Sequence, residues 1–309
     1  MPNYTPEELL EMYSDGFKGT VFDPQHYEQF LSELKYSDIY GANPLLSGSG
    51  AGKLSTPYKS VIALSPVTPY LERQVTGDCV SHSTRNAGDI SRAVEIHVKS
   101  ELEAFVTIGA TEAIYGSRGF GGQGMSCSRA AAFLTKDGGI LLRKKYDGFD
   151  LTNYQGMLGA GWGSRGIPKV VREEAVKHKF MTSTLIRSVA EARDALANGY
   201  GISVCSNYGF SSVRDKNGIA RPQGSWNHAM CWTACDDTKS FYSGTLFLVQ
   251  NSWGKFNSGG HPPWGPIPDG SFLITEDVAD RMIRQGGAFV FSSFDGFPLQ
   301  KLPNYGVDI

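Results

Sequence analysis

The order of sequence patterns along the 309 residues predicts an α+β fold in two lobes. Helical periodicity dominates the first half of the chain, whereas runs typical of strands appear in the second half. Helices followed by strands indicate an α+β chain, because alternating βα units would favour a parallel sheet instead. We therefore divide the chain into an N-terminal arm (1–56), a helical lobe (57–165) and a β-rich lobe (166–309).

Two short amphipathic helices are expected in the arm, over residues 6–14 and 24–36. The second has Asp23 as its cap and a proline in its first turn, both typical of helix starts. Residues 41–57 are rich in Gly and Ser, as flexible linkers are. The SGSGAGKLS run within them fails as a phosphate-binding loop, since Leu54 stands where Ser or Thr should hold magnesium.

The helical lobe is expected to open with an extended, proline-punctuated segment over residues 58–70. An apolar stripe at helical spacing then predicts a long helix over residues 78–105. A helical turn is expected over 110–116, and a further helix over 128–136 ends at a pair of glycines.

The β-rich lobe begins with a helix and continues with strands. A capping box at Ser188–Glu191 opens the helix, which stops at Gly199. Runs rich in strand-forming residues follow, separated by Gly, Pro, Asn and Asp. They cover residues 201–206, 229–234, 245–250, 271–275 and 288–292.

Composition narrows the function classes. Lys and Arg number 29 against 31 Asp and Glu, a net charge of −2, so no broad basic field favours nucleic-acid binding. No apolar run approaches the roughly 20 residues that span a bilayer, and the N-terminus lacks a signal-peptide core. Five cysteines, a low and odd number, argue against a disulfide-stapled secreted scaffold. We expect a soluble chain, cytoplasmic or within a particle assembled inside a cell, without nucleic-acid or membrane partners.

Cys79 is the candidate nucleophile because it stands at the N-terminal end of the long predicted helix. A thiol there meets free backbone N–H groups and the positive end of the helix dipole, which both favour the thiolate. A free cysteine that only fills space in the core is the alternative.

His228 and Asn251 are the candidate base and its orienting partner. His228 lies where a loop turns into a strand, and Asn251 ends the next strand. An imidazole that takes a thiol proton must be oriented through its other nitrogen, and an Asn side-chain oxygen does this.

Taken in order, these motifs resemble the papain-like cysteine peptidases. The matching stretches are Gln74 to Cys79, Gly119–Gly122, Asn227-His228-Ala229 and Asn251-Ser252-Trp253-Gly254. The separation of His228 from Cys79 lies within the roughly 130–150 residues of that family. The resemblance implies a two-lobed fold, a helical lobe and an antiparallel β-barrel-like lobe, with the active-site cleft between them.

The resemblance also implies roles for particular residues. Cys79 as thiolate pairs with protonated His228 and attacks a peptide carbonyl, forming an acyl-enzyme. The Gln74 amide and the Cys79 backbone N–H hold the oxyanion, Asn251 orients the histidine, and Trp253 shields that hydrogen bond.

Substrate contacts are expected from Gly121, Gly122, Asn227 and Trp253. The implied partner is a protein or peptide substrate, and the implied chemistry needs neither a metal nor another cofactor.

Departures from the family pattern surround the nucleophile. Gln74 stands one residue closer to Cys79 than the family's glutamine does, so its reach into the oxyanion hole requires a local loop adjustment. Asp78 replaces a small neutral residue, and a carboxylate that pointed inward would oppose the thiolate. Thr76 and Gly119 replace cysteines that staple the family's first lobe, which agrees with a reducing compartment.

Several residues have competing interpretations. His82 follows Cys79 by one helical turn and is the alternative base, although it lacks an orienting partner. Cys205, Cys231 and Cys235 suggest a zinc site only weakly, because their spacing lacks the tighter pairs of such sites. Cys127 is expected to pack or to form a cleft wall, and the basic run 143–145 to be a solvated strand edge.

The first functional hypothesis is therefore a cysteine endopeptidase. The second is a papain-like module that serves as a structural or docking component of a larger assembly, for example a virion, with the arm as its docking segment. The third is a cysteine amidase that cuts cell-wall peptides.

Overall fold

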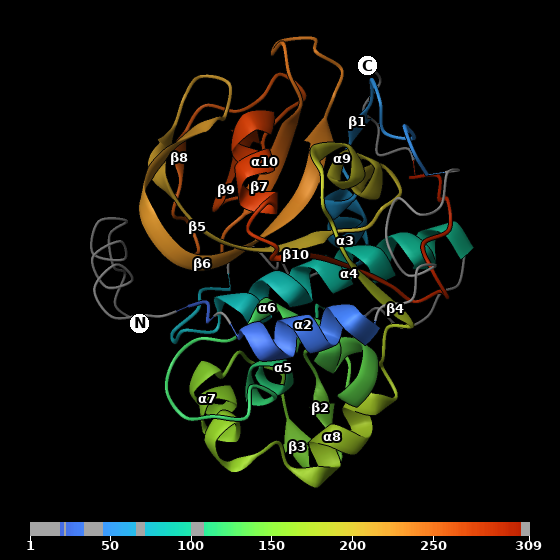
Figure 1. The fold of residues 1–309 in the computed structure, drawn as a ribbon, viewed down its shortest axis with the longest axis vertical. Helices are drawn as coiled ribbons and strands as arrows, with labels where there is room; N and C mark the ends of the chain where they lie inside the picture. Colours follow the sequence, from blue (N-terminus) through green and yellow to red (C-terminus); the bar gives the residue numbers. More distant parts are fainter. Residues whose placement is uncertain (1–18, 22, 34–45, 66–71, 100–107, 304–309) are drawn as a thin grey trace.

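The computed structural model describes residues 19–21, 23–33, 46–65, 72–99 and 108–303, and these form two lobes (Figure 1). The helices are α2 (Pro24–Glu33), α3 (Tyr58–Leu64), α4 (Cys79–Lys99), α5 (Glu112–Gly116), α6 (Cys127–Ala132), the π-helical turn η3 (Phe133–Asp137), α7 (Gly156–Arg165), α8 (Lys169–Val176), α9 (Val189–Ala197) and α10 (Glu276–Ile283). The strands are β1 (Leu54–Ser55), β2 (Lys145–Tyr146), β3 (Phe149–Asp150), β4 (Thr182–Leu185), β5 (Ile202–Arg214), β6 (Ala220–Asp236), β7 (Leu246–Gln250), β8 (Ser258–Gly259), β9 (Ser271–Thr275) and β10 (Ala288–Ser292).

One large sheet forms the β-rich lobe, and its order is β4-β10-β5-β6-β7-β9. Every neighbouring pair along this path is antiparallel. The long hairpin of β5 and β6 contains register shifts, which let both strands bend. The predicted α+β architecture in two lobes is confirmed.

Helix α4 lies between the lobes and packs on both (Figure 1). It contacts β5, β6 and β10 on one side and α5 and α6 on the other. Small residues such as Ala87 and Ala93 are fully buried on it, so neighbouring backbones approach closely. The helix that begins with the candidate nucleophile is therefore held firmly in the core.

The described part of the arm packs on the protein's own body. The predicted helix is confirmed as α2, with the Asp23 side chain accepting the His26 backbone N–H at 3.1 Å. Asp23 also pairs with Arg129 at 2.8 Å, and the Phe30 ring packs edge-on against Phe289 at 5.7 Å. These contacts tie α2 to both lobes.

The linker prediction is wrong for the residues that the structure describes there. The backbone N–H groups of Gly48 and Gly50 donate to the Asp194 carboxylate at 2.7 and 2.9 Å, and β1 pairs with β6. The segment predicted to be extended over 58–70 is helical over 58–64. Local composition missed both features because the partners lie far away in the sequence.

The long predicted helix is confirmed as far as Lys99, and its predicted residues 100–105 lie outside the described residues. All the predicted strand runs are confirmed, whereas α7, α8, α10 and the strands β1–β4 and β8 were not predicted. Helix α7 contains glycines throughout its length, which hides its helical periodicity. The predicted helix over 6–14 lies outside the described residues, and the lobe boundaries at 56 and 165 stay predictions.

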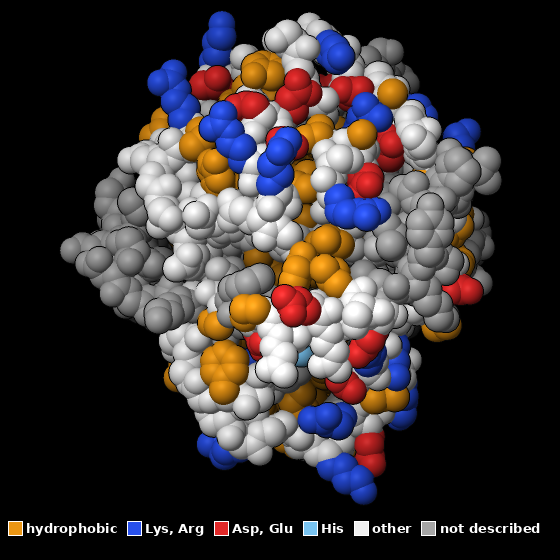
Figure 2. All heavy atoms as spheres, in the orientation of Figure 1, with side chains coloured by type: hydrophobic (Ala, Val, Ile, Leu, Met, Phe, Trp, Pro, Cys, Tyr) orange, Lys and Arg blue, Asp and Glu red, His pale blue; other side chains and the backbone are white. Residues whose placement is uncertain are grey.

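On the face drawn in Figure 2, acidic and basic side chains are interspersed, and neither sign forms a continuous field. Among the helices that the structure describes, none combines the length and apolar character needed to cross a bilayer.

Candidate active site

Cys79 is the first residue of α4 and is fully buried. Its Sγ accepts the backbone N–H of Ala229 at 3.3 Å, so the β-rich lobe reaches the thiol directly. Burial raises the pKa of Cys79 to about 12; the Ala229 N–H opposes this shift, and the Asp78 carboxylate adds to it. The expected lowering by the helix terminus is therefore outweighed here, and the thiol is neutral.

His228 in β6 is oriented by Asn251, which follows β7. His228 Nε2 lies 2.8 Å from Asn251 Oδ1, and the same oxygen accepts the Ser252 backbone N–H at 2.7 Å. Because this atom accepts a backbone N–H, it is the amide oxygen, and His228 Nε2 must carry the proton. Nδ1 of His228 is then the nitrogen that can take a proton. Burial lowers the pKa of His228 to about 4, although the Asn251 bond favours the charged form.

Aromatic rings enclose this histidine. The Trp253 ring lies 4.5 Å from the His228 ring between centroids, and Trp226 packs on Trp253 at 4.7 Å. Phe256 packs edge-on against both tryptophans. His228 and Asn251 are both buried beside this apolar box, and the shielding role of Trp253 stays a prediction.

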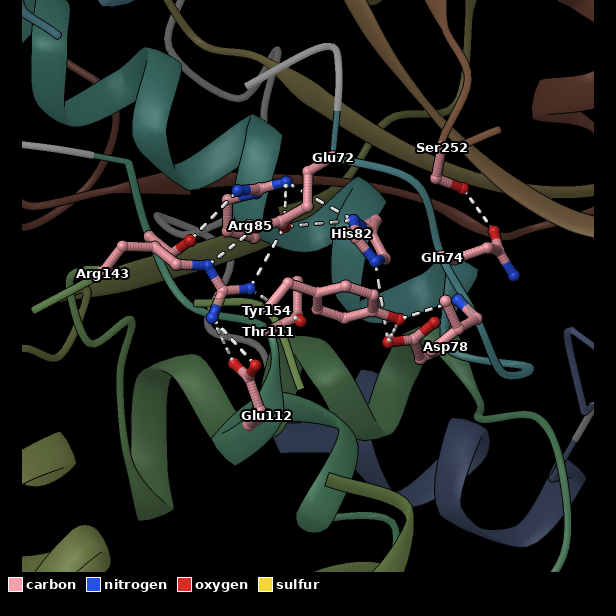
Figure 3. Close-up of polar contacts among 12 residues, drawn as sticks. Glu72, Gln74, Asp78, His82, Arg85, Thr111, Glu112, Arg143, Tyr154 and Ser252 are labelled. Carbon is pink, nitrogen blue, oxygen red and sulfur yellow. Dashed lines mark hydrogen bonds and ion pairs between the residues drawn. The ribbon is translucent and has the colours of Figure 1, made fainter. Parts of the chain in front are cut away.

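Gln74 is anchored in the loop that precedes the nucleophile. Its Nε2 donates to the Thr76 carbonyl at 2.8 Å, and its backbone N–H donates to the Ser252 carbonyl at 2.9 Å. Its Oε1 accepts the Ser252 hydroxyl (Figure 3). The side chain thus connects this loop to the segment that carries Asn251, and its expected oxyanion role stays a prediction.

Residues 19–21 of the arm run through the site. Thr20 N–H donates to the Asn227 carbonyl and Val21 N–H to the Met125 carbonyl, both at 3.0 Å, while Met125 N–H donates to Gly19 at 3.3 Å. The segment runs parallel to the chain at Met125 and bridges the two lobes.

Gly19 rests against the nucleophile. A Cβ atom added at Gly19 would lie 2.6 Å from Cys79 Sγ, so only glycine fits between the arm and the thiol. The covering segment contributes to the burial that keeps the thiol neutral. The described start of the arm therefore covers the sulfur.

The predicted substrate residues differ in whether they contact residues 19–21 of the arm. Gly121 and Gly122 are exposed. In the helical lobe, it is the backbone of Met125 that pairs with residues 19–21 of the arm. The backbone carbonyl of Asn227 does face the segment. Met125 was missed because its only local signal is that it follows the glycine cluster directly.

A disulfide joins Cys127 of α6 to Cys205 of β5, a pairing that was not predicted, and it removes Cys205 from the zinc interpretation. It links the two lobes and, with Thr20 and Val21, lines a cavity of about 630 Å³. Its partners lie 78 residues apart, so spacing did not reveal the pair. Disulfides persist mainly in oxidising compartments, which weakens the argument for a reducing one.

Cys79, Cys231 and Cys235 are the free cysteines of the described residues. Burial raises the pKa of both Cys231 and Cys235. Within the described ranges, no three His, Cys, Asp or Glu side chains are grouped so that they could hold a metal ion.

A charged cluster in the helical lobe is built around Arg143 and includes Glu72, Arg85 and Glu112 (Figure 3). Arg143 contacts Glu72 through Nε at 2.8 Å and Nη2 at 3.1 Å, and Glu112 through Nη1 at 2.8 Å. Arg85 approaches Glu72 at 3.1 Å. Burial raises the pKa of Glu72, but the two guanidinium groups outweigh it and hold that pKa below its usual value. The predicted solvated position of Arg143 is wrong, since this side chain neutralises carboxylates in the core.

His82 belongs to this charged cluster. Its Nδ1 lies 3.7 Å from Glu72 and its Nε2 lies 3.6 Å from Asp78, and Nε2 has no hydrogen-bond partner among the described residues. Burial lowers the pKa of His82 to about 3. The Asp78 carboxylate is directed toward this cluster, where it accepts the Tyr154 hydroxyl at 2.8 Å. Burial raises the pKa of Asp78 to about 8.

Comparison with known proteins addresses the fold. Neither protein-family models nor curated sequences give a match. The proform of the ragweed pollen cysteine protease Amb a 11 superposes with a TM-score of 0.51 at 13% identity, over 78% of this chain and 65% of that chain. The fold is papain-like. Xylellain, a cysteine protease from Xylella fastidiosa, gives a TM-score of 0.48 at 16% identity, over 76% of this chain and 89% of that chain.

In this papain-like arrangement, the two candidate catalytic residues come from different lobes. Cys79 begins a helix of the helical lobe, and His228 lies on the hairpin of the β-rich lobe. The Ala229 N–H contact brings the two elements together at the thiol.

Proposed function

We propose that the protein is a cysteine endopeptidase that acts through Cys79 and His228. One observation carries the proposal: the N–H of Ala229 touches the Cys79 sulfur while its neighbour His228 is oriented by Asn251. A purely structural cysteine needs neither a histidine-bearing strand at its sulfur nor an oriented imidazole.

The proposed reaction is acyl transfer in two steps. The Cys79 proton passes to His228 Nδ1, and the sulfur bonds to the peptide carbonyl carbon. The C–N bond breaks as His228 returns the proton to the leaving amine, which leaves a thioester on Cys79. A water then loses a proton to His228 and attacks the thioester, and the released thiol regains that proton. The Cys79 N–H and the Gln74 amide stabilise the oxyanion.

The described form is latent in this proposal, because residues 19–21 occupy the cleft. The backbone groups of Met125 and Asn227 that pair with the arm are those that an extended peptide substrate would use. A substrate therefore has to displace the segment before it reaches the thiol. Displacement also admits water, which favours the thiolate and the imidazolium ion.

Thiol labelling tests the proposal. A Thr20→Pro/Val21→Pro variant lacks both arm N–H donors, so we expect iodoacetamide to label its Cys79 faster than in the wild type. His228→Ala in the same background should abolish the gain. Cys231 and Cys235, the other free thiols of the described residues, provide internal references. We call the Thr20→Pro/Val21→Pro protein the released variant. The proposal fails if its Cys79 reacts with iodoacetamide no faster than Cys231 and Cys235.

Substrate assays separate the alternatives. We expect the released variant to cleave an unfolded protein, and its Cys79→Ala form to leave that protein intact. An amidase would label in the same way but would cut only cell-wall peptides. A structural module would cut neither substrate.

A further inference from the structure

Tyr154 holds the loop that leads into the nucleophile. Its hydroxyl accepts the Val75 backbone N–H at 3.1 Å and donates to the Asp78 carboxylate at 2.8 Å (Figure 3). These two residues flank the turn between Gln74 and Cys79. A single hydroxyl therefore ties together both ends of the turn that carries the proposed oxyanion donors.

The position of the Tyr154 ring is itself fixed. The ring packs edge-on against His82 at 5.0 Å, and the Arg143 guanidinium lies 5.5 Å from its centre. A Cβ atom at Gly156 would lie 2.4 Å from the Tyr154 hydroxyl, so a glycine is needed to leave space for it. The charged cluster thus supports a ring that reaches from the core of the helical lobe to the nucleophile loop.

Gln123 holds the middle of the same turn. Its Oε1 accepts the Thr76 hydroxyl at 2.7 Å and also accepts the Gly77 N–H. Together, Tyr154 and Gln123 satisfy donors of three successive residues in the turn. None of these hydrogen bonds ends on the thiol or on His228, so their direct effect is on the loop.

We propose that Tyr154 and Asp78 form a positioning pair that sets the geometry of the oxyanion loop. The inference rests on the proposed peptidase function and goes beyond it, because neither residue is needed for the chemistry at sulfur. It explains two departures of this loop from the family pattern, the presence of Asp78 and the spacing of Gln74. Asp78 accepts the Tyr154 hydroxyl and so holds it in place. Gln74 stands one residue closer to Cys79 than in the family, and the turn between them is held by Tyr154 and Gln123.

The pair should affect one part of the reaction. An oxyanion forms only in the transition state of acyl transfer, so a loosened loop lowers kcat and leaves KM nearly unchanged. Alkylation of Cys79 by iodoacetamide forms no oxyanion, and it therefore reports on the catalytic pair alone. The two readouts separate a misplaced loop from a damaged nucleophile.

The test compares variants in the Thr20→Pro/Val21→Pro background. Tyr154→Phe keeps the ring and removes the hydroxyl, and we expect kcat on a peptide amide to fall about 10- to 100-fold, somewhat less than loss of a whole oxyanion donor. Asp78→Ala should lower kcat by a similar factor, while the Cys79 alkylation rate should not fall, because the carboxylate that is lost raises the pKa of that thiol. Asp78→Asn retains an oxygen that accepts the Tyr154 hydroxyl and should rescue kcat to within about threefold. The control is Tyr146→Phe, whose hydroxyl accepts the Leu142 N–H elsewhere in the lobe.

Three outcomes would count against the inference. If Tyr154→Phe keeps the kcat of its Thr20→Pro/Val21→Pro parent, the hydroxyl does not position the loop. A parallel fall of kcat and of the Cys79 alkylation rate shows general structural damage instead. A parent that neither turns over the peptide nor labels Cys79 overturns the peptidase proposal and this inference together, whereas the first two outcomes leave the peptidase proposal standing.

Discussion

Two buried histidines lie near Cys79, and their surroundings are opposites. His228 is packed among aromatic rings and has one amide partner, Asn251. His82 lies among carboxylates and guanidinium groups, and its Nε2 has no hydrogen-bond partner within the described part of the chain. Burial lowers the pKa of both, to about 4 and about 3. The candidate base is therefore the histidine whose ring is oriented by a neutral amide, and not the one that lies among charged groups.

The part of the site in the β-rich lobe and the part in the helical lobe differ in the same way. On the side of the β-rich lobe, a neutral hydrogen bond fixes a tautomer inside an apolar box. On the side of the helical lobe, Arg143 and Arg85 neutralise Glu72 and Glu112 in the core. Removing charged groups from water costs free energy, and removing one partner of a buried ion pair costs more, because the other charge is left uncompensated. We therefore expect changes in the aromatic box to affect catalysis and changes in the charged cluster to affect stability.

Replacing the two histidines gives the largest expected contrast. In the released background, His228→Ala should lower kcat/KM about 10³- to 10⁴-fold, the upper part of the range for a lost general acid–base group. His82→Ala should lower it less than about tenfold, because the side chains of Glu72, Asp78 and Arg85 hold the His82 ring in the charged cluster, whereas a neutral amide orients His228. Steady-state kinetics on one peptide amide check both values. Equal losses in the two variants would remove the basis for choosing His228.

Breaking the charged cluster should give the largest loss of stability. Arg143→Ala leaves the carboxylates of Glu72 and Glu112 buried without this partner, so we expect the free energy of unfolding to fall by about 3–5 kcal/mol. Urea titration measures it. Lys145→Ala, an exposed neighbour in the same basic run, is the matched control and should change it by less than about 0.5 kcal/mol. A small effect in Arg143→Ala would mean that the cluster is open to water.

The disulfide connects the two sides, and its removal should have the next largest effect. We expect Cys127→Ser/Cys205→Ser to lose about 2–4 kcal/mol of unfolding free energy, since the crosslink restricts the unfolded chain. A dithiol reductant should lower the stability of the wild type by a similar amount and leave the variant unchanged. If the reductant changed both equally, the loss would have another origin.

The sequence predicted the aromatic side of the site better than the charged side. Cys79, His228 and Asn251 stand in short motifs at the ends of regular elements, so local patterns were sufficient to select them. The roles of Arg143, Tyr154 and Met125 depend on residues tens of positions away, and no local pattern encodes such contacts. The disulfide was missed for the same reason, because only the packing of α6 against β5 brings its cysteines together.

Asp78 lies where the two sides meet, and its replacement should change how the stability depends on pH. Its folded-state pKa of about 8 lies above the ordinary value of 3.8, since burial disfavours the carboxylate. The stabilising contribution is thus complete below about pH 4 and is lost as the pH rises toward 8, because the unfolded chain ionises first. Asp78→Asn cannot ionise and should lack this loss.

Thermal unfolding between pH 4 and 9 measures the difference. We expect the Tm of the wild type to fall relative to that of Asp78→Asn by several degrees as the pH rises from about 4 to about 8, because the unfolded chain ionises before the buried carboxyl does. Above pH 8 the difference should become constant, since Asp78 is then ionised in both states. Parallel curves over the whole range would mean that Asp78 is already ionised in the folded protein. The charged cluster would then extend as far as the nucleophile, and the separation between the two sides of the site would disappear.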